Sequence, residues 1–151
     1  MVLPMNVEAY LKRADDLCRQ RGARFTPLRR RVLELIASTD KPLGAYALLD
    51  LLKEDDAQAQ RKAAPPTVYR ALDFLLEHGL VHRIASYNTY IICDHPGHRH
   101  DGLFLLCSDC GAVSELEAST VTSAIHSAAQ KRQFKIGESH LEITGLCAKC
   151  R

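Results

Sequence analysis

The chain has 151 residues, of which 46% are hydrophobic, and a formal net charge of +2. A chain of this length buries one modest core or two small ones. No stretch approaches the length of an apolar membrane span, and residues 1–6 lack the basic and apolar regions of an export signal. We therefore expect a cytoplasmic protein with no membrane partner and with reduced cysteines.

The first half of the chain carries helical patterns. Apolar residues at helical spacing predict a helix near residues 6–21, which Gly22 ends, with Cys18 as a small buried residue of its apolar stripe. Thr26 and Pro27 give the next helix an N-cap and a proline at its first position.

Arginines are concentrated across the junction between these two helices, where no acid interrupts them. The arginines are Arg19, Arg21, Arg24, Arg29, Arg30 and Arg31. Such a density suits a phosphate backbone, and it also suits a solvated helix face.

Leucines predict a third helix near 44–55, and the polar segment Asp55–Ala64 predicts a loop. Asp50 and Lys53 are exposed on this third helix. They are candidates for a contact between neighbouring dimers on DNA, or for a solvated pair.

The fourth helix has the features of a DNA-reading element. Pro65-Pro66 opens it and Gly79 closes it. Its inward-facing residues are expected to be Val68, Leu72, Leu75 and Leu76. The side chains of Tyr69 and Arg70 are then exposed near the start of this helix. Polar residues at the start of a recognition helix contact base edges, and an arginine there can make two hydrogen bonds to one guanine.

A β-hairpin follows this helix, as in a winged helix. Residues 81–85 and 90–93 are rich in strand-forming types around Ser86 to Thr89. If Tyr87 and Asn88 form the turn, His82 lies directly opposite Cys93, and both can reach one metal ion.

Two further residues flank the first cysteine pair at a spacing that completes this ligand set. They are His100 and Glu115. His95 and His98 compete with His100 for the same role.

Two Cys-x-x-Cys pairs predict a second, closed metal site. The pairs are Cys107/Cys110 and Cys147/Cys150, separated by 36 residues that suffice for a strand, a helix and a return strand. Four thiolates in two knuckles fill the tetrahedral coordination of structural zinc. A thiol redox pair and a disulfide framework are the alternatives, although neither pair opens a helix after a strand.

The motifs together resemble the ferric uptake regulator superfamily of metal-responsive repressors. The resemblance rests on the run 65–72 (PPTVYRAL), the wing residues 79–82 (GLVH) and the knuckle 107–111 (CSDCG). Within the superfamily the chain is most similar to the zinc uptake regulator branch, because of the run 65–75 and Cys93 at the end of the wing.

This resemblance implies an α+β protein with a winged-helix DNA-binding domain (1–94), a hinge (95–101) and an α/β dimerisation domain (102–151). It implies a structural zinc on the four knuckle cysteines and a sensory zinc on His82, Cys93, His100 and Glu115. It also implies a homodimer bound to double-stranded operator DNA. The DNA-contacting positions that it implies are Tyr46 and Arg70. Thr67 and Tyr69, in the same first turns of the fourth helix, are further candidates for DNA contact.

Ligand chemistry separately favours zinc at the sensory site. The thiolate of Cys93 makes this site soft, whereas iron, manganese and peroxide sensing usually rest on nitrogen and oxygen ligands. The predicted function is a zinc-responsive repressor with two zinc ions per chain. An iron- or other metal-sensing relative and a zinc storage or delivery protein are the alternatives. A zinc hydrolase is disfavoured because it needs an open coordination position.

Overall fold

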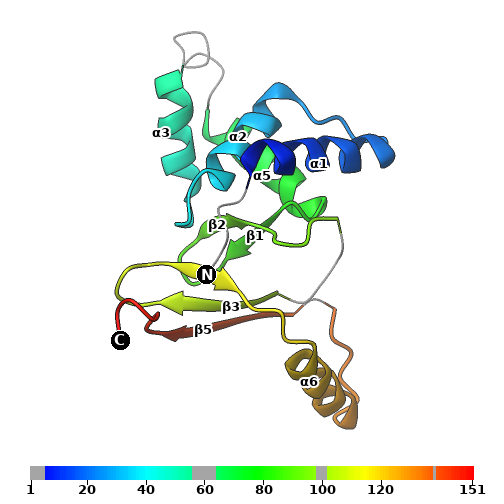
Figure 1. Cartoon of the computed structure of the whole chain (residues 1–151). Coiled ribbons are helices and arrows are strands. Elements are labelled where there is room, and N and C mark those ends of the chain that lie inside the picture. The colour runs from blue at the N-terminus through cyan, green and yellow to red at the C-terminus, as the bar shows by residue number, and fades with distance from the viewer. Residues whose placement is uncertain (1–5, 56–63, 98–101, 138) are drawn as a thin grey trace. The chain divides into compact units, whose positions relative to one another are not determined.

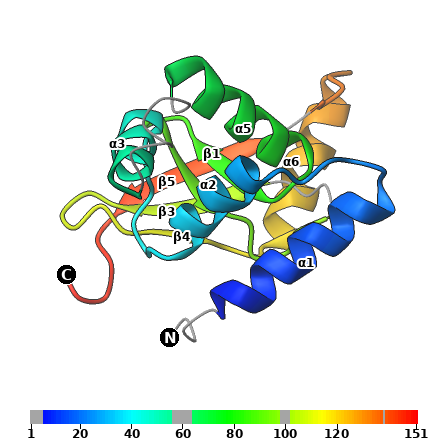
Figure 2. The same ribbon diagram turned by 90° about the horizontal axis from the view of Figure 1, so that it is seen from above.

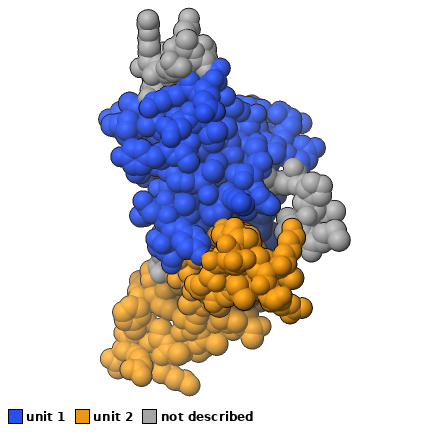
Figure 3. Space-filling view, turned by 90° about the vertical axis from the view of Figure 1, so that its left-hand side faces the viewer, with its two compact units in different colours: residues 1–98 blue, residues 99–151 orange. Residues whose placement is uncertain are grey.

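The computed structural model describes residues 6–55, 64–97, 102–137 and 139–151. The chain divides into two compact units, Met1–His98 and Arg99–Arg151 (Figure 3). Within the described residues, no helix has both the length and the apolar character needed to cross a membrane. The predicted hinge at 95–101 stays a prediction, since part of it lies outside the described residues.

Unit 1 contains four described helices and a two-stranded hairpin (Figures 1 and 2). These elements are α1 (Val7–Gln20), α2 (Pro27–Ala37), α3 (Ala45–Asp55), α5 (Pro65–Glu77), β1 (Val81–Ile84) and β2 (Thr89–Ile92). Helix α2 contacts α1, α3 and α5, and it also contacts β2. It is therefore the element around which unit 1 is assembled.

Helix ends follow the capping signals in the sequence. The Asn6 side chain accepts a hydrogen bond from the backbone N–H of Ala9, and Thr26 accepts one from Arg29. Gly22 adopts a φ of 65°, the left-handed conformation that ends a helix at low cost. The predicted bounds of the first helix are thus confirmed to within one residue, and so is the predicted start of the second helix.

The core of unit 1 lies between the apolar stripes of these helices. Its fully buried side chains include Leu11, Val32, Leu33, Ile36, Leu48, Val68, Leu72 and Leu75. Cys18 is buried in this core, as the sequence predicts. Leu76 was expected to face inward but is only half-buried, and Phe74 is buried in the same helix turn.

The register of the hairpin differs from the prediction. His82 pairs with Ile91, and the backbone N–H of Cys93 donates to the carbonyl of Leu80. The prediction that His82 lies directly opposite Cys93 is therefore wrong. The strands are joined by residues 85–88, with Asn88 at a φ of 50° and its N–H bonded to Ala85, instead of by a two-residue turn. Because the pairing shifts by two residues, His82 and Cys93 still share one face of the hairpin, as diagonal neighbours.

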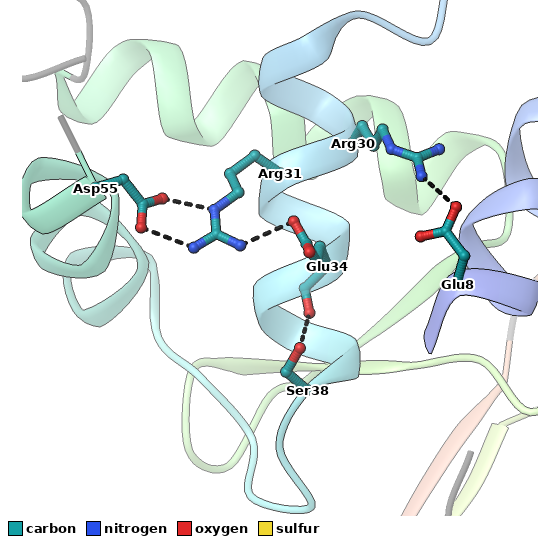
Figure 4. A network of polar contacts seen from close by, with 6 residues as sticks. All are labelled: Glu8, Arg30, Arg31, Glu34, Ser38 and Asp55. Carbon is teal, nitrogen blue, oxygen red and sulfur yellow. Dashed lines mark hydrogen bonds and ion pairs between the residues drawn. The ribbon is translucent and has the colours of Figure 1, made fainter. Parts of the chain in front are cut away.

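The arginine-rich segment takes a large part in interhelical contacts (Figure 4). Arg31 on α2 binds Asp55 at the end of α3 and also Glu34, whose carboxylate lies 2.8 Å away. Arg30 on α2 lies 2.9 Å from Glu8 on α1. The hydrogen bonds from Arg31 lower the pKa of the Asp55 carboxyl, so this carboxylate stays ionised.

Two other arginines of the segment contact uncharged groups, which do not neutralise the guanidinium charge. Arg21 donates to two backbone carbonyls, and the Arg29 guanidinium lies 3.8 Å above the ring of Phe74. Arg19, in contrast, pairs with Asp15. Three of the six arginines thus already face carboxylates, so the segment is less available to phosphates than its sequence indicates.

Unit 2 is a three-stranded sheet with one helix. Its elements are β3 (Gly102–Cys107), β4 (Val113–Glu115), α6 (Ser119–Lys131) and β5 (His140–Gly145). The strand order is β4-β3-β5, with β4 antiparallel and β5 parallel to β3. The segment between the two cysteine pairs therefore forms the predicted strand, helix and return strand. The predicted α+β class is confirmed.

Candidate metal centres and nucleic-acid interface

The two cysteine knuckles meet because of the topology of unit 2. Strands β3 and β5 run parallel, so both end at the same edge of the sheet. Cys107 is the last residue of β3 and pairs with Gly145, the last residue of β5. Cys147 follows two residues later, and the first knuckle is tied to β5 by Ser108, whose backbone N–H donates to Gly145.

The four thiols have the spacing of a tetrahedral zinc site. The four sulfur atoms all lie within 4.8 Å of one another, and the sulfurs of Cys110 and Cys147 are 3.8 Å apart. A tetrahedral ion with zinc–sulfur bonds of ~2.3 Å separates its ligands by roughly 3.8 Å, whereas a disulfide brings two sulfurs to about 2.05 Å. All four cysteines are free thiols. These residues therefore fit zinc and do not fit a disulfide framework.

Backbone geometry prepares Cys107 to act as a thiolate. Hydrogen bonds from the backbone N–H groups of Cys110, Cys147 and Asp109 lower the pKa of the Cys107 thiol to about 6. The N–H of Cys147 lies 3.4 Å from the Cys107 sulfur. Cys150 differs, because hydrogen bonding to Asp109 and to the neighbouring thiols raises its pKa. A bound cation reverses such an increase, since metal binding displaces the proton.

A second pair of candidate ligands lies on the hairpin of unit 1. His82 on β1 and Cys93 just after β2 are both buried, and their ligand atoms lie within 4.8 Å of each other. One zinc ion bound to both requires about 3.5 Å between nitrogen and sulfur. The predicted strand register was wrong, but the prediction that His82 and Cys93 lie on the same face of the hairpin agrees with the structure.

Helix α1 contacts the backbone of this candidate site. The Tyr10 hydroxyl lies 2.9 Å from the carbonyl oxygen of Cys93 and 2.8 Å from that of Leu80. Burial raises the pKa of Tyr10, and the nearby Cys93 thiol adds to the increase, so the hydroxyl keeps its proton and donates. Tyr10 has the apolar spacing of the buried residues of α1, which by itself does not indicate this contact. The available signal was that a buried tyrosine hydroxyl usually finds a partner.

Of the other two predicted sensory ligands, the structure describes only Glu115. Glu115 is half-buried at the end of β4 in unit 2, opposite Phe104. His100 and His98 lie outside the described residues. His95 is exposed after β2, and within the described part of the chain it does not belong to the group formed by His82 and Cys93.

The predicted DNA-contacting residues lie at the surface of unit 1. Tyr46 in the first turn of α3 is 67% exposed, and Tyr69 and Arg70 are exposed near the start of α5. Thr67 in the first turn of α5 is half-buried. Helices α3 and α5 pack against each other, so these side chains come from adjacent elements. Their contact with DNA stays a prediction.

Comparison with known proteins identifies the family. The sequence model described as the ferric uptake regulator family matches residues 20–144. The zinc uptake regulation protein of Escherichia coli (strain K12) is 45% identical over 146 residues, which cover 95% of this chain and 82% of the relative. The chain belongs to the ferric uptake regulator family. A more distant relative is the peroxide operon regulator of Bacillus subtilis (strain 168), which is 27% identical over 93% of this chain and 92% of the relative.

Solved structures of the ferric uptake regulator family support the same assignment. A zinc uptake regulator complexed with zinc and DNA matches with a TM-score of 0.87 and 42% identity, over 96% of this chain and 95% of that one. The holo form of XcZur matches with a TM-score of 0.83 and 42% identity, over 93% and 96%. The predicted family and its zinc uptake regulator branch are thereby confirmed.

The first testable prediction concerns the four-cysteine site. Cys107→Ser should unfold unit 2, because α6 has no buried residue and β5 is largely exposed, so that the sheet depends on its metal. Structural zinc contributes on the order of 10 kcal/mol to modules of this kind. Circular dichroism and zinc content measure the effect. Cys18→Ala, which removes a thiol from the core of unit 1, is the matched control and should keep the zinc. A Cys107→Ser protein with wild-type zinc content and melting would contradict the assignment.

Proposed function

We propose that this protein is a transcriptional repressor that binds operator DNA as a dimer when a sensory zinc site is filled, and so controls zinc uptake and homeostasis genes. The observation that carries the proposal is the buried thiol of Cys93 within reach of His82. A soft sulfur beside an imidazole selects zinc over harder ions. The 45% identity with a zinc uptake regulation protein supports the same metal.

The proposed sensory set is His82, Cys93, His100 and Glu115. Two ligands come from the hairpin, one from the segment after it and one from β4. Together with the four knuckle cysteines, this set gives two zinc ions per chain. Both sets offer four protein ligands, which leaves no open position for catalysis, and the protein is a regulator and not an enzyme.

The proposed DNA-reading surface is the exposed start of α5. Arg70 is the side chain that we assign to a base edge, with Tyr69, Thr67 and Tyr46 beside it. The similarity to a zinc uptake regulator complexed with zinc and DNA supports this surface. Two copies of α5 related by a twofold axis would meet two half-sites of a palindrome.

A second copy of the chain is the partner that we propose for unit 2. Leu105 on β3 is 39% exposed and pairs with Ile143 on β5, which is 45% exposed. Leu141, two residues before Ile143, lies on the same face of the sheet and is 37% exposed. Three adjacent apolar side chains on one sheet face are costly in water, and a symmetric contact removes them from it.

Contact between neighbouring dimers on DNA is the least supported element of the proposal. Asp50 and Lys53 are both exposed on α3, one helical turn apart. They can meet oppositely charged residues of another dimer, or they can remain a solvated pair.

Zinc acts in this proposal as an effector. Bound at the sensory site, it links ligands from separate segments and favours the arrangement that fits DNA, by binding that arrangement more tightly. The residues of the chain do the rest, since the hairpin presents His82 and Cys93 while α5 presents Arg70.

Two alternatives are separated by direct measurement. An iron- or other metal-sensing regulator would gain operator affinity with that metal at concentrations below those at which zinc acts. A zinc storage or delivery protein would bind no operator at any zinc concentration. Footprinting of the zinc-loaded protein on genomic DNA, repeated with ferrous and manganous ions, distinguishes these outcomes.

The second prediction concerns the number of zinc ions. Purified protein should hold two per chain, one that resists mild chelation at the four thiolates and one that leaves readily from the mixed site. Native mass spectrometry after graded chelation counts both. A single class of zinc would refute the two-site proposal.

The third prediction separates sensing from folding. Cys93→Ser should keep the dimer and the tightly bound zinc but lose zinc-dependent operator binding, because a serine hydroxyl is a poor zinc ligand. Size-exclusion chromatography and mobility-shift titrations measure the two properties. If the variant gained DNA affinity over the wild-type range of zinc, Cys93 would not be a sensory ligand, and His95 or His98 would be substituted next.

The fourth prediction concerns Arg70. Arg70→Ala should cost roughly 1–3 kcal/mol of operator binding and relax the sequence preference at one symmetric pair of positions. Arg132→Ala, which removes an exposed arginine from unit 2, controls for the loss of charge. Affinities for operator and scrambled duplexes across a salt series provide the test. Equal losses on both duplexes would show that Arg70 contacts only the backbone.

A further inference from the structure

The side chain of Tyr10 crosses from α1 to the open end of the hairpin. Its hydroxyl lies within hydrogen-bond distance of two carbonyl oxygens, those of Leu80 and Cys93. Leu80 and Cys93 lie opposite each other just beyond the outermost strand pair, Val81 and Ile92. The N–H of Cys93 donates to the carbonyl of Leu80 at 3.1 Å. The Tyr10 hydroxyl therefore bonds to the chain both where it enters the hairpin, at Leu80, and where it leaves it, at Cys93.

The chain after Cys93 is held to α1 at a second point. Arg21, at the C-terminal end of α1, donates to the carbonyl of Gly97 at 2.6 Å and to that of His78 at 3.0 Å. Gly97 has a φ of 93°, and a β-carbon there would lie 2.9 Å from the Leu17 side chain. The segment 93–97 thus lies along α1, bonded to Tyr10 at its first residue and to Arg21 at its last.

We propose that Tyr10 is a positioning residue for the sensory metal site: its hydroxyl fixes the backbone at Cys93 and thereby aims the thiol toward His82. This inference rests on the proposed function, because it takes Cys93 as a sensory ligand. It goes beyond that function by assigning to α1, which carries none of the proposed ligands, a direct part in metal affinity.

The hydroxyl, and not the ring, is the part of Tyr10 that carries this role. The ring belongs to the apolar core of unit 1, where phenylalanine would pack equally well. The hydroxyl instead bonds to the residue that bears the thiol, and such outer hydrogen bonds orient metal ligands and commonly change affinity by ten- to a hundredfold.

The experiment compares Tyr10→Phe with Tyr90→Phe. Tyr90 is a buried tyrosine on β2 of the same hairpin, and among the described residues its hydroxyl makes no bond to Cys93. Competition with a chromophoric chelator measures zinc affinity at both sites of the intact protein. The melting of variants that keep the tightly held zinc but lack the readily released one measures folding. We expect Tyr10→Phe to weaken the readily released zinc about tenfold. The tightly held zinc should be unchanged, and Tyr90→Phe should leave both affinities within about twofold of wild type.

Cobalt substitution gives a spectroscopic signal that would not change if Tyr10 contributed only to folding. Cobalt at the sensory site should show a thiolate charge-transfer band in the near ultraviolet, and Tyr10→Phe should weaken or shift this band at saturating metal. A band identical to wild type, together with an unchanged zinc affinity, would overturn the inference.

A double-mutant cycle shows whether Tyr10 acts through Cys93. In a Cys93→Ser background, Tyr10→Phe should have no further effect on the residual affinity of the sensory site. An equal tenfold loss in both backgrounds would assign Tyr10 a general effect on folding and reject its role toward Cys93.

The inference and the proposed function fail in different ways. If Cys93→Ser leaves the weaker site intact, the proposed ligand set fails, and the inference fails with it. If Cys93→Ser strongly weakens that site while Tyr10→Phe behaves like Tyr90→Phe, the proposed function stands and only the inference is rejected. Should Tyr10→Phe lower the melting temperature, affinities are compared at a temperature where every variant is folded.

Discussion

The parallel pairing of β3 with β5 is the constraint on which unit 2 depends. Parallel strands end at one edge of a sheet, so the knuckle after β3 and the knuckle after β5 arrive side by side. The register places Gly145 opposite Cys107, so the second knuckle begins two residues after the level at which the first one begins. A shift of the pairing by two residues would displace one knuckle by almost 7 Å along the strand, which is farther than a zinc site tolerates.

Unit 1 is organised differently, since its core is large enough to fold without a metal. Helix α2 contacts three helices and the hairpin, and its arginines bond to α1 and α3 (Figure 4). Each exposed ion pair contributes little to stability. Their value is geometric, because they fix how α3 and α1 lie against α2. The hairpin packs against α2 and α5 and is also bonded to α1 through Tyr10.

The sequence predicted features that depend on local signals. Helix caps at Thr26 and Gly22, three of the four inward positions predicted for α5 and the two cysteine knuckles each depend on nearby residues, and the structure confirms them. The hairpin register was missed because a two-residue turn at Tyr87 and Asn88 and a four-residue connection at 85–88 are both compatible with this sequence. That error left His82 and Cys93 on one face, since side chains alternate with a period of two.

Interactions between segments that are distant in the chain could not be predicted from the sequence. Nothing in the spacing of the arginines shows that Arg31 pairs with Asp55, or that Arg29 covers Phe74. The bond between Tyr10 and Cys93 joins residues 83 positions apart, and the same helical stripe would accommodate a leucine at position 10. His100 and His98 lie outside the described residues, so the choice between them as ligands rests on the resemblance alone.

The attachment of the hairpin to α1 limits how zinc can act. A ligand shifts an equilibrium only by its difference in affinity between two states. If His82 and Cys93 hold the sensory zinc, they do so on a hairpin whose end is bonded to α1, as far as Gly97. The recognition helix α5 contacts β1 directly, so hairpin and helix form one packed body. A zinc-dependent change within this body would break those bonds and repack its core. The difference in affinity must therefore arise from the ligands that lie beyond Gly97, and those ligands decide whether zinc is an effector or only a structural ion.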